Sequence, residues 1–204
     1  MVYRPGIPAV KERPLVVVPE GLARDARGKT LPAPSFVFRQ VLDYVAGIAT
    51  PATVVYLAPA NRFDGNVFEQ EAAYAYLTAR SACRQIHCPV YPAPEYVDTL
   101  GNARLLQRYL MDRNGWPPGP VDLVCADIHS YRARYCFARS GYRIARVHRV
   151  PFRVLSGERI VNRLWYYRVR PAHVVYEMSA TARDLIRCAV FGHGNSLPES
   201  AGDW

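Results

Sequence analysis

Lysine and long apolar runs are scarce in this 204-residue sequence. Lys11 and Lys29 are its only lysines, so arginine supplies nearly all of the positive charge behind the formal net charge of +9. No run approaches the roughly 18 consecutive apolar residues that suggest a membrane-spanning helix. The first residues, with their prolines and charges, do not have the pattern of a signal peptide. We therefore expect a soluble, cytoplasmic protein without a membrane partner.

Paired cysteine motifs are also absent. The five cysteines never form a C-x-x-C pair, and their number is odd; they are Cys83, Cys88, Cys125, Cys136 and Cys188. An odd set without a regular spacing argues against a disulfide framework and favours a reducing compartment. The spacing of Cys83 and Cys88 does not match a zinc site, so no metal is expected.

The excess of arginine has two explanations. Codon usage in a GC-rich genome would produce it without any function. Recognition of an anion would also produce it, because guanidinium groups pair bidentately with phosphate and carboxylate. The arginines are spread along the chain without a nucleic-acid-binding motif, so nucleic acid is not the expected partner. A basic strip over residues 143–153 keeps nucleic-acid binding open as an alternative, with a solvated edge as the default interpretation.

Short β-branched runs alternate with amphipathic segments along the chain. Strands are predicted at 15–18, 53–57, 87–91, 121–126 and 144–147, and helices at 36–46, 67–82, 99–113, 130–140 and 172–191. Loops are predicted at 21–34, 58–66 and 114–120, while 152–170 is left unassigned. This alternation predicts an α/β, Rossmann-like, mostly parallel sheet with helices on both faces. We expect a single domain over 1–204, with a core of about 14–191 and a loose tail at 192–204.

Ligands of open parallel sheets bind at the carboxyl ends of the strands. This rule selects four short segments, and the candidate residues in them are Glu20, Asn61, Arg62, Asp98, Thr99 and His129. Three of these segments open a predicted helix, and helix amino termini attract anions. A small anionic molecule is therefore the expected ligand.

His129 and Arg132 form the sharpest pair, because residues three apart on a helix face the same way. A histidine can exchange protons near neutral pH, and an adjacent arginine can hold phosphate or carboxylate. The alternative is a histidine bonded to backbone beside a solvated arginine. Thr99 and Asn102 repeat the spacing, although a threonine there can simply cap its helix.

Glu71 lies at the edge of the predicted apolar stripe of helix 67–82. Its carboxylate could position Arg132, bind a ligand group or act as a base. The alternative is an exposed helix charge. Glu69 competes with it for each of these roles.

Three short motifs occur in order: Glu71-Ala72, then 98–103 (Asp-Thr-Leu-Gly-Asn-Ala), then 127–133 (Asp-Ile-His-Ser-Tyr-Arg-Ala). Together they resemble the YdcF/SanA/ElyC-type bacterial family of unknown function, over about residues 14–191. A closing helix that carries Glu177 is similar as well. The resemblance implies a Rossmann-like fold with a site made by Glu71, Thr99, Asn102, His129 and Arg132. It also implies S-adenosylmethionine as a possible ligand, reported for one branch, and envelope roles for membrane-anchored branches.

Two turns depart from that family. Pro19-Glu20-Gly21-Leu22 stands where the family has glycines after its first strand, and 58–61 (Ala-Pro-Ala-Asn) replaces a Ser-Gly-Gly-like turn. Bulkier backbone restricts the close approach of a phosphate, so a different ligand is expected. The missing membrane anchor favours a specialised cytoplasmic enzyme.

These observations lead to three hypotheses. The first is a hydrolase or transferase for a nucleotide or phosphorylated sugar, in which Arg132 and Arg62 hold the anion and His129 moves a proton. In it Glu71 orients His129 or the substrate, while Thr99 and Asn102 donate or accept hydrogen bonds. The second is a binding module for S-adenosylmethionine or another nucleotide, without catalysis. The third is a basic nucleic-acid-binding protein.

Overall fold

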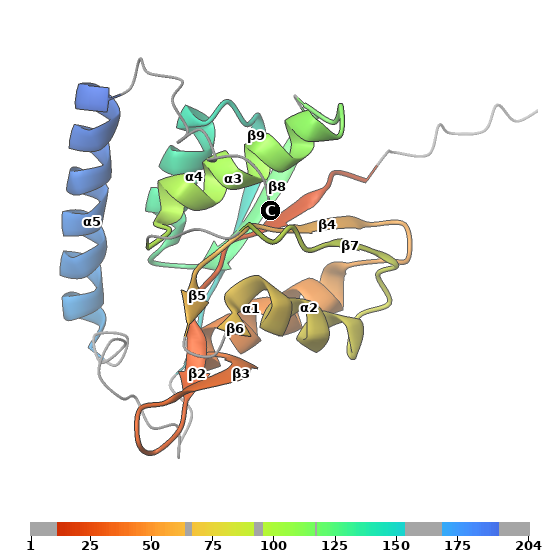
Figure 1. The fold of residues 1–204 in the computed structure, drawn as a ribbon, viewed down its shortest axis with the longest axis horizontal. Helices are drawn as coiled ribbons and strands as arrows, with labels where there is room; N and C mark the ends of the chain where they lie inside the picture. Colours follow the sequence, from red (N-terminus) through yellow and green to blue (C-terminus); the bar gives the residue numbers. More distant parts are fainter. Residues whose placement is uncertain (1–11, 64–66, 92–95, 117, 154–168, 192–204) are drawn as a thin grey trace, which may run out of the picture.

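A parallel sheet of five strands, in the order β7-β4-β1-β8-β9, forms the centre of the protein (Figure 1). The computed structural model describes residues 12–63, 67–91, 96–116, 118–153 and 169–191. The strands of the sheet are β1 (Leu15–Val17), β4 (Val54–Leu57), β7 (Gln85–His87), β8 (Val121–Ala126) and β9 (Ile144–Val150). The protein is therefore an α/β protein with a Rossmann-like sheet, as its sequence predicts.

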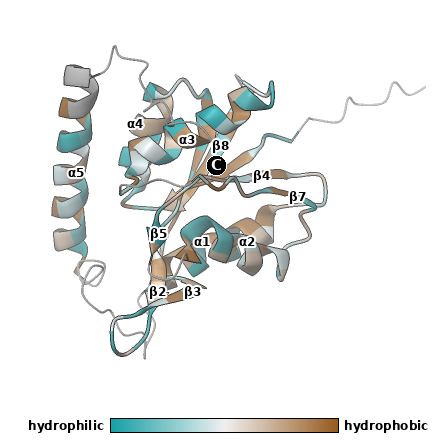
Figure 2. Ribbon diagram, in the orientation of Figure 1, coloured by the Kyte–Doolittle hydropathy of each residue, from teal (hydrophilic) through white to brown (hydrophobic). Residues whose placement is uncertain are grey.

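Helices cover both faces of this sheet. They are α1 (Phe36–Ile48), α2 (Glu69–Thr78), α3 (Thr99–Asp112) and α4 (Ser130–Arg139), while α5 (Arg170–Phe191) packs against α4. Val17 packs in one core cluster with α1 and α2, whereas Val16 packs in a second cluster with α3 and α4. Successive strand residues point to opposite faces, and both faces are buried here, which explains the uninterrupted apolar runs of β1 and β8. Figure 2 shows the hydrophobic colours concentrated on these central strands.

The order of the strands places a switch point between β1 and β8. From β1 the chain moves outward through β4 to β7, returns to β8 on the other side of β1, and ends the sheet with β9. The connections therefore cover one face before the switch and the other face after it. At such a point the loops that leave the carboxyl ends of two adjacent strands diverge and open a crevice.

Ser35 and Gly141 act at helix ends as the sequence predicts. The Ser35 hydroxyl accepts a hydrogen bond from the Phe38 amide at 3.1 Å, so it caps α1, and donates to the Glu20 carbonyl at 2.8 Å. The second bond ties the start of α1 to the segment after β1. Gly141 follows the end of α4 with a φ of 86°, a left-handed conformation that favours glycine.

Two predicted loops contain short hairpins. β2 (Leu22–Arg24) and β3 (Thr30–Pro34) are antiparallel strands within 21–34, and β5 (Arg62–Phe63) pairs with β6 (Val67–Phe68) beside 58–66. These strands have two to five residues, too few to show an alternating pattern, and prolines interrupt β3. The prediction of structureless loops was wrong in both places. Gly21 enters the first hairpin with a φ of 90°.

Other boundaries move by a few residues. The third strand of the sequence pattern is β7 at Gln85–His87, not 87–91, and Cys88 and Pro89 follow it. α2 begins at Glu69 because residues 67–68 pair with β5. β9 lies at the edge of the sheet, where Arg146 and Arg149 are exposed, in agreement with a solvated edge.

Across the described residues, no helix combines the length and the apolar character needed to cross a membrane. The predicted loose tail at 192–204 and the aromatic cluster Trp165-Tyr166-Tyr167 lie outside the described residues.

Candidate functional site

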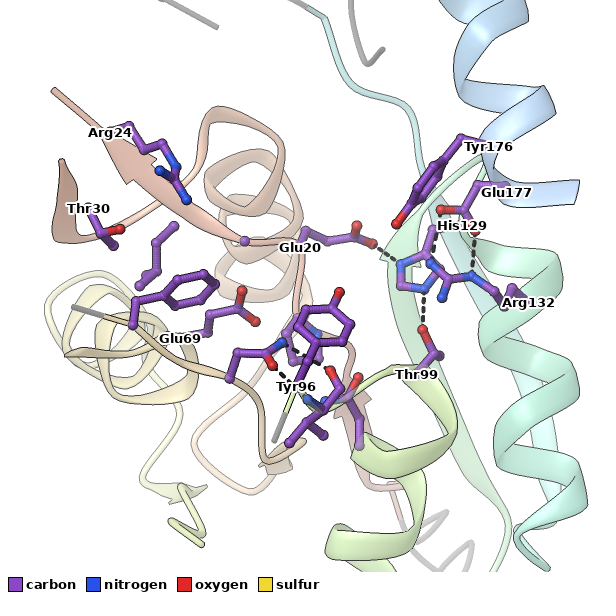
Figure 3. A pocket seen from close by; sticks show the side chains of 17 residues that line it. Glu20, Arg24, Thr30, Glu69, Tyr96, Thr99, His129, Arg132, Tyr176 and Glu177 are labelled. Carbon is purple, nitrogen blue, oxygen red and sulfur yellow. Dashed lines mark hydrogen bonds and ion pairs between the residues drawn. The ribbon is translucent and has the colours of Figure 1, made fainter. Parts of the chain in front are cut away.

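A cavity of about 330 Å³ opens at the carboxyl ends of β1 and β8 (Figure 3). It is lined by six of the residues that the sequence analysis selects: Glu20, Asn61, Thr99, Asn102, His129 and Arg132. Tyr96 and Tyr176 also line it, and both residues are partly exposed to solvent. The rule that ligands bind at strand carboxyl ends therefore located the cavity in advance.

His129 stands between a carboxylate and a hydroxyl group. Its Nδ1 lies 2.9 Å from Oε1 of Glu20, and its Nε2 lies 3.1 Å from the hydroxyl oxygen of Thr99. A carboxylate can only accept, so Nδ1 carries the proton. In the neutral form of the ring, Nε2 accepts a hydrogen bond from the Thr99 hydroxyl. All three residues are at most 4% exposed.

The fold explains why these three residues meet. Glu20 follows β1, His129 follows β8 at the start of α4, and Thr99 is the first residue of α3. Oε1 of Glu20 also accepts a hydrogen bond from the Ala126 amide at 2.8 Å, which fixes the carboxylate against the end of β8. The imidazole is thus oriented by a group that is itself held in place, an arrangement typical of a general base.

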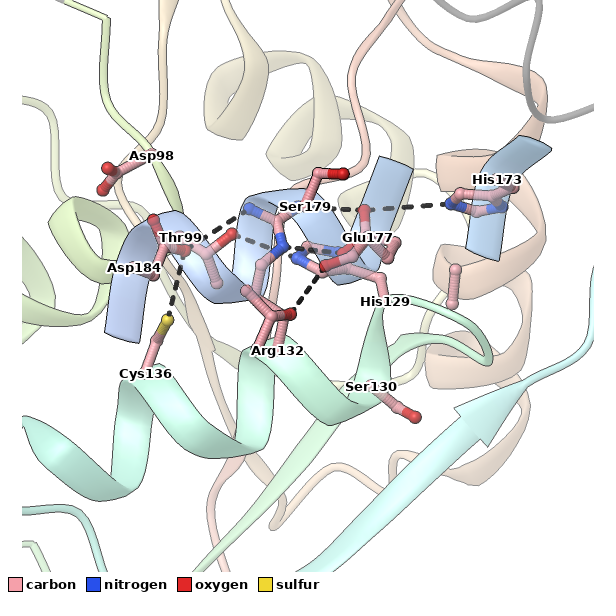
Figure 4. Close-up of polar contacts among 12 residues, drawn as sticks. Asp98, Thr99, His129, Ser130, Arg132, Cys136, His173, Glu177, Ser179 and Asp184 are labelled. Carbon is pink, nitrogen blue, oxygen red and sulfur yellow. Dashed lines mark hydrogen bonds and ion pairs between the residues drawn. The ribbon is translucent and has the colours of Figure 1, made fainter. Parts of the chain in front are cut away.

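Arg132 is bound to carboxylates rather than free. Its Nε and Nη2 donate to Glu177 of α5 at 2.7 and 3.0 Å, and its Nη1 lies 3.9 Å from Asp184 (Figure 4). Burial alone would lower the pKa of Arg132, but the hydrogen bonds and negative charge of Glu177, together with Asp184, raise it above the ordinary value. The sequence predicts that Arg132 holds an anion of the ligand, but in the structure Glu177 already balances the charge of Arg132.

Glu177 was found in the sequence only through the family resemblance, and it lines the cavity beside Arg132. Burial would raise its pKa, yet the charges of His129 and Arg132 outweigh this effect and lower it. α5 presents a polar face to the protein, since His173, Glu177 and Asp184 are buried while Val175 and Met178 are exposed. An ionic contact thus attaches α5 to α4.

The two asparagines of the cavity brace its walls. Asn61 accepts from the Val97 amide at 2.7 Å and donates to the Val97 carbonyl at 3.0 Å. Asn102 donates to the carbonyl of Pro59 at 2.6 Å. These bonds connect the loop after β4 with the start of α3, and they give both residues a structural role in addition to any contact with a ligand.

Three predicted residues do not line the cavity. Asp98 caps α3 by accepting from the Gly101 amide at 2.8 Å, and it lies 3.8 Å from Arg183. Arg62 and Glu71 are exposed. The structure therefore does not bring Glu71 to His129, and Glu20 takes the position beside the imidazole that the sequence analysis offered to Glu71.

Glu69 and Arg24 line the cavity in their place. The predicted apolar stripe of helix 67–82 consists of Phe68, Ala72, Ala75, Tyr76 and Ala79. That prediction was wrong in part, because Ala75 and Ala79 are exposed whereas Glu69 and Gln70 are buried. Gln70 is buried because its amide accepts from the Ala60 amide and donates to the Pro89 carbonyl. Buried polar residues of this kind leave no signal in an apolar pattern, although the analysis did name Glu69 as a competitor.

Within the described ranges, His, Cys, Asp and Glu side chains form no group of three that could hold a metal ion. Comparisons of the chain with protein-family models, with curated proteins and with solved structures find no match. The similarity to the YdcF/SanA/ElyC-type family therefore stays a prediction, and function is argued from the site alone.

Proposed function

We propose that this chain is an enzyme that binds a small molecule with an anionic group and uses His129 to transfer a proton. A nucleotide or a phosphorylated sugar is the class of substrate. The observation that supports it is the hydrogen-bonded line from Glu20 through His129 to Thr99 inside a cavity at the switch point of the sheet. A reducing, cytoplasmic location belongs to the same proposal, and among the described residues Cys83, Cys88, Cys125 and Cys136 form no disulfide bond.

The geometry suits general base catalysis. Glu20 holds the Nδ1 proton of His129, so the lone pair of Nε2 is available to a hydroxyl group. That hydroxyl is Thr99 in the structure, and in a complex a water molecule or a substrate hydroxyl would take its place. When the ring gains the second proton, the adjacent Glu20 carboxylate stabilises the imidazolium ion.

Arg24 is the cation that supports an anionic substrate best. It lines the cavity, and its Nη1 donates to the carbonyl of Gly28 at 2.9 Å. None of its other N–H groups has a partner among the described residues, in contrast to Arg132. Figure 3 shows Arg24 on the opposite side of the cavity from His129. A substrate would therefore bind with its anion near Arg24 and its reacting group near the imidazole.

Turnover by wild-type protein and two variants tests this proposal. The substrates are p-nitrophenyl phosphate, p-nitrophenyl acetate, and a panel of nucleotides and sugar phosphates followed by mass spectrometry. We expect His129→Gln to lower any observed turnover at least about 100-fold, the ordinary contribution of a general base. Glu71→Gln, which changes an exposed carboxylate outside the cavity, is the matched control and should keep full activity.

Undiminished turnover by a folded His129→Gln variant would refute the catalytic role. Calorimetry with S-adenosylmethionine and the same nucleotides separates the enzyme from a binding module. Tight binding without any product over several hours would support the module instead.

A further inference from the structure

Glu69 is a buried carboxyl group that the proposed proton transfer does not use. It is the first residue of α2, its side chain lines the cavity, and it is only 5% exposed. Its carboxyl oxygens have no hydrogen-bond or ion-pair partner among the described residues. Figure 3 shows the side chain directed into the cavity. A carboxyl group that lines a cavity and has no described protein partner is available to a ligand, because buried polar groups are normally hydrogen-bonded.

No described side chain that lines the cavity forms an ion pair with Glu69. The titratable and charged side chains that line the same cavity are Glu20, Arg24, Tyr96, His129, Arg132, Tyr176 and Glu177. His129 is bonded to Glu20, Arg132 to Glu177, and Arg24 to a backbone carbonyl. Glu69 therefore forms no ion pair with a described residue of the cavity, and Arg24, whose hydrogen bond goes to a neutral carbonyl, is the cation that we assign to the anionic group of the ligand.

The pKa of Glu69 agrees with the lack of an ion pair. Burial, together with the negative charge of Glu20, raises the pKa of Glu69 to about 8. The carboxyl group is therefore mostly protonated at neutral pH in the protein alone. A cation that entered beside it would favour the ionised form and displace the proton.

We propose that Glu69 recognises a protonated amine of the ligand, which therefore carries an ammonium group as well as an anionic one. This inference rests on the proposed function, because it concerns the same cavity. An ammonium group supplies both the missing charge and up to three hydrogen-bond donors. A hydroxyl group in its place supplies one donor and no charge. Aminoalkyl phosphates and amino-sugar phosphates have both required groups.

Two pairs of probes that differ only in the amine test the proposal. They are O-phosphoethanolamine with 2-hydroxyethyl phosphate, and glucosamine 6-phosphate with glucose 6-phosphate, titrated by calorimetry. In at least one pair the amine should bind wild-type protein about tenfold more tightly, as a charge-assisted hydrogen bond implies. The preference should disappear in Glu69→Gln and persist in Glu71→Gln, the exposed neighbour on the same helix.

Proton release gives a second measurement. Titration of the amine in two buffers of different ionisation enthalpy should reveal protons released by wild-type protein at pH 7 and none released by Glu69→Gln. No amine preference in either pair, or an equal preference in Glu69→Gln, would overturn the assignment. The isosteric glutamine preserves the packing, and an unchanged melting temperature verifies that the variant is folded.

His129→Gln separates this inference from the catalytic proposal. It should abolish turnover and keep the amine preference, because Glu69 is unaltered in it. An amine preference that depends on Glu69, in a protein whose His129→Gln variant stays fully active, would leave the recognition role standing and remove the catalytic one. The opposite pattern would remove only the recognition role.

Discussion

Oε1 of Glu20 and Nδ1 of His129 lie 2.9 Å apart, although 109 positions separate the two residues in the sequence. The same oxygen of Glu20 accepts from the Ala126 amide at 2.8 Å. One carboxylate thus orients the imidazole and also accepts the hydrogen bond of the last amide of β8. Substitutions can separate these hydrogen bonds from the stabilisation of an imidazolium ion, because only the stabilisation requires a negative charge.

Glu20→Gln should cost little stability and much activity. The amide oxygen of glutamine can accept both hydrogen bonds, so the free energy of unfolding should fall by less than about 1 kcal/mol. The charge that stabilises the imidazolium is lost, so turnover should fall by about 100-fold or more. Glu20→Ala should lower the stability by about 1–3 kcal/mol, because it leaves the buried Ala126 amide unpaired. Urea unfolding and initial rates measure both effects. Equal activity of Glu20→Gln and wild type would contradict the orienting role.

Substitution of Arg132 should lower the stability of the protein, because its side chain is paired with Glu177. Arg132→Leu leaves Glu177 buried without its hydrogen-bonded counter-charge, whereas Asp184 keeps Arg183, and the expected loss is about 3–5 kcal/mol. The double variant Arg132→Leu/Glu177→Leu should recover a large part of that loss, because both members of the pair become apolar. Chemical unfolding of the single and double variants measures this coupling. Additive losses would show that the pair does not act as a unit.

Glu69→Gln should change how stability depends on pH. The folded-state pKa of about 8 lies above the ordinary value of 4.5, so the contribution of Glu69 to stability is complete below pH 4.5 and is lost as the pH rises to about 8. The glutamine variant has no such loss. Its advantage over wild type should therefore grow between pH 5 and 8, reaching on the order of 3 kcal/mol. Urea unfolding at several pH values measures the difference, and Glu71→Gln should follow the wild-type curve. Parallel curves for Glu69→Gln and wild type would rule out a buried, raised-pKa carboxyl.

Thr99 should tolerate serine but not valine. Serine keeps the hydroxyl that lies 3.1 Å from Nε2 of His129, whereas isosteric valine leaves that buried nitrogen unpaired. Thr99→Val should therefore lose about 1–3 kcal/mol of stability, and Thr99→Ser should lose much less. Thermal unfolding of both variants measures this. A variant Thr99→Val as stable as Thr99→Ser would show that the hydroxyl contributes nothing to the line of hydrogen bonds.

The sequence was informative where local patterns carry the information. The apolar runs of β1 and β8, the Ser35 cap and the Gly141 helix end are short-range features, and the structure has each of them. The position of the cavity could be predicted too, because it follows from the order of elements in a parallel sheet. His129 and Thr99 belong to the segments selected in this way.

Contacts between distant segments were not readable in advance. Glu71 was placed beside His129, but the position beside the imidazole belongs to Glu20, because only the pairing of β1 with β8 brings residues 20 and 129 together. Arg132 was assigned to an anion, but the docking of α5 supplies Glu177 as its partner. Periodicity also missed Glu69, because a cavity allows a carboxyl group to be buried on an otherwise apolar face.

By itself, the sequence determined the α/β class, the alternation of strands and helices, and the ends of the strands at which a ligand can bind. These properties depend on hydrophobic periodicity and backbone preferences that act over a few residues. Only the tertiary structure decided which carboxylate orients His129, which one neutralises Arg132, and that Glu69 has no partner among the described residues. The physical reason is that charge pairing and desolvation depend on distances between groups that the chain brings together only when the sheet and its helices pack.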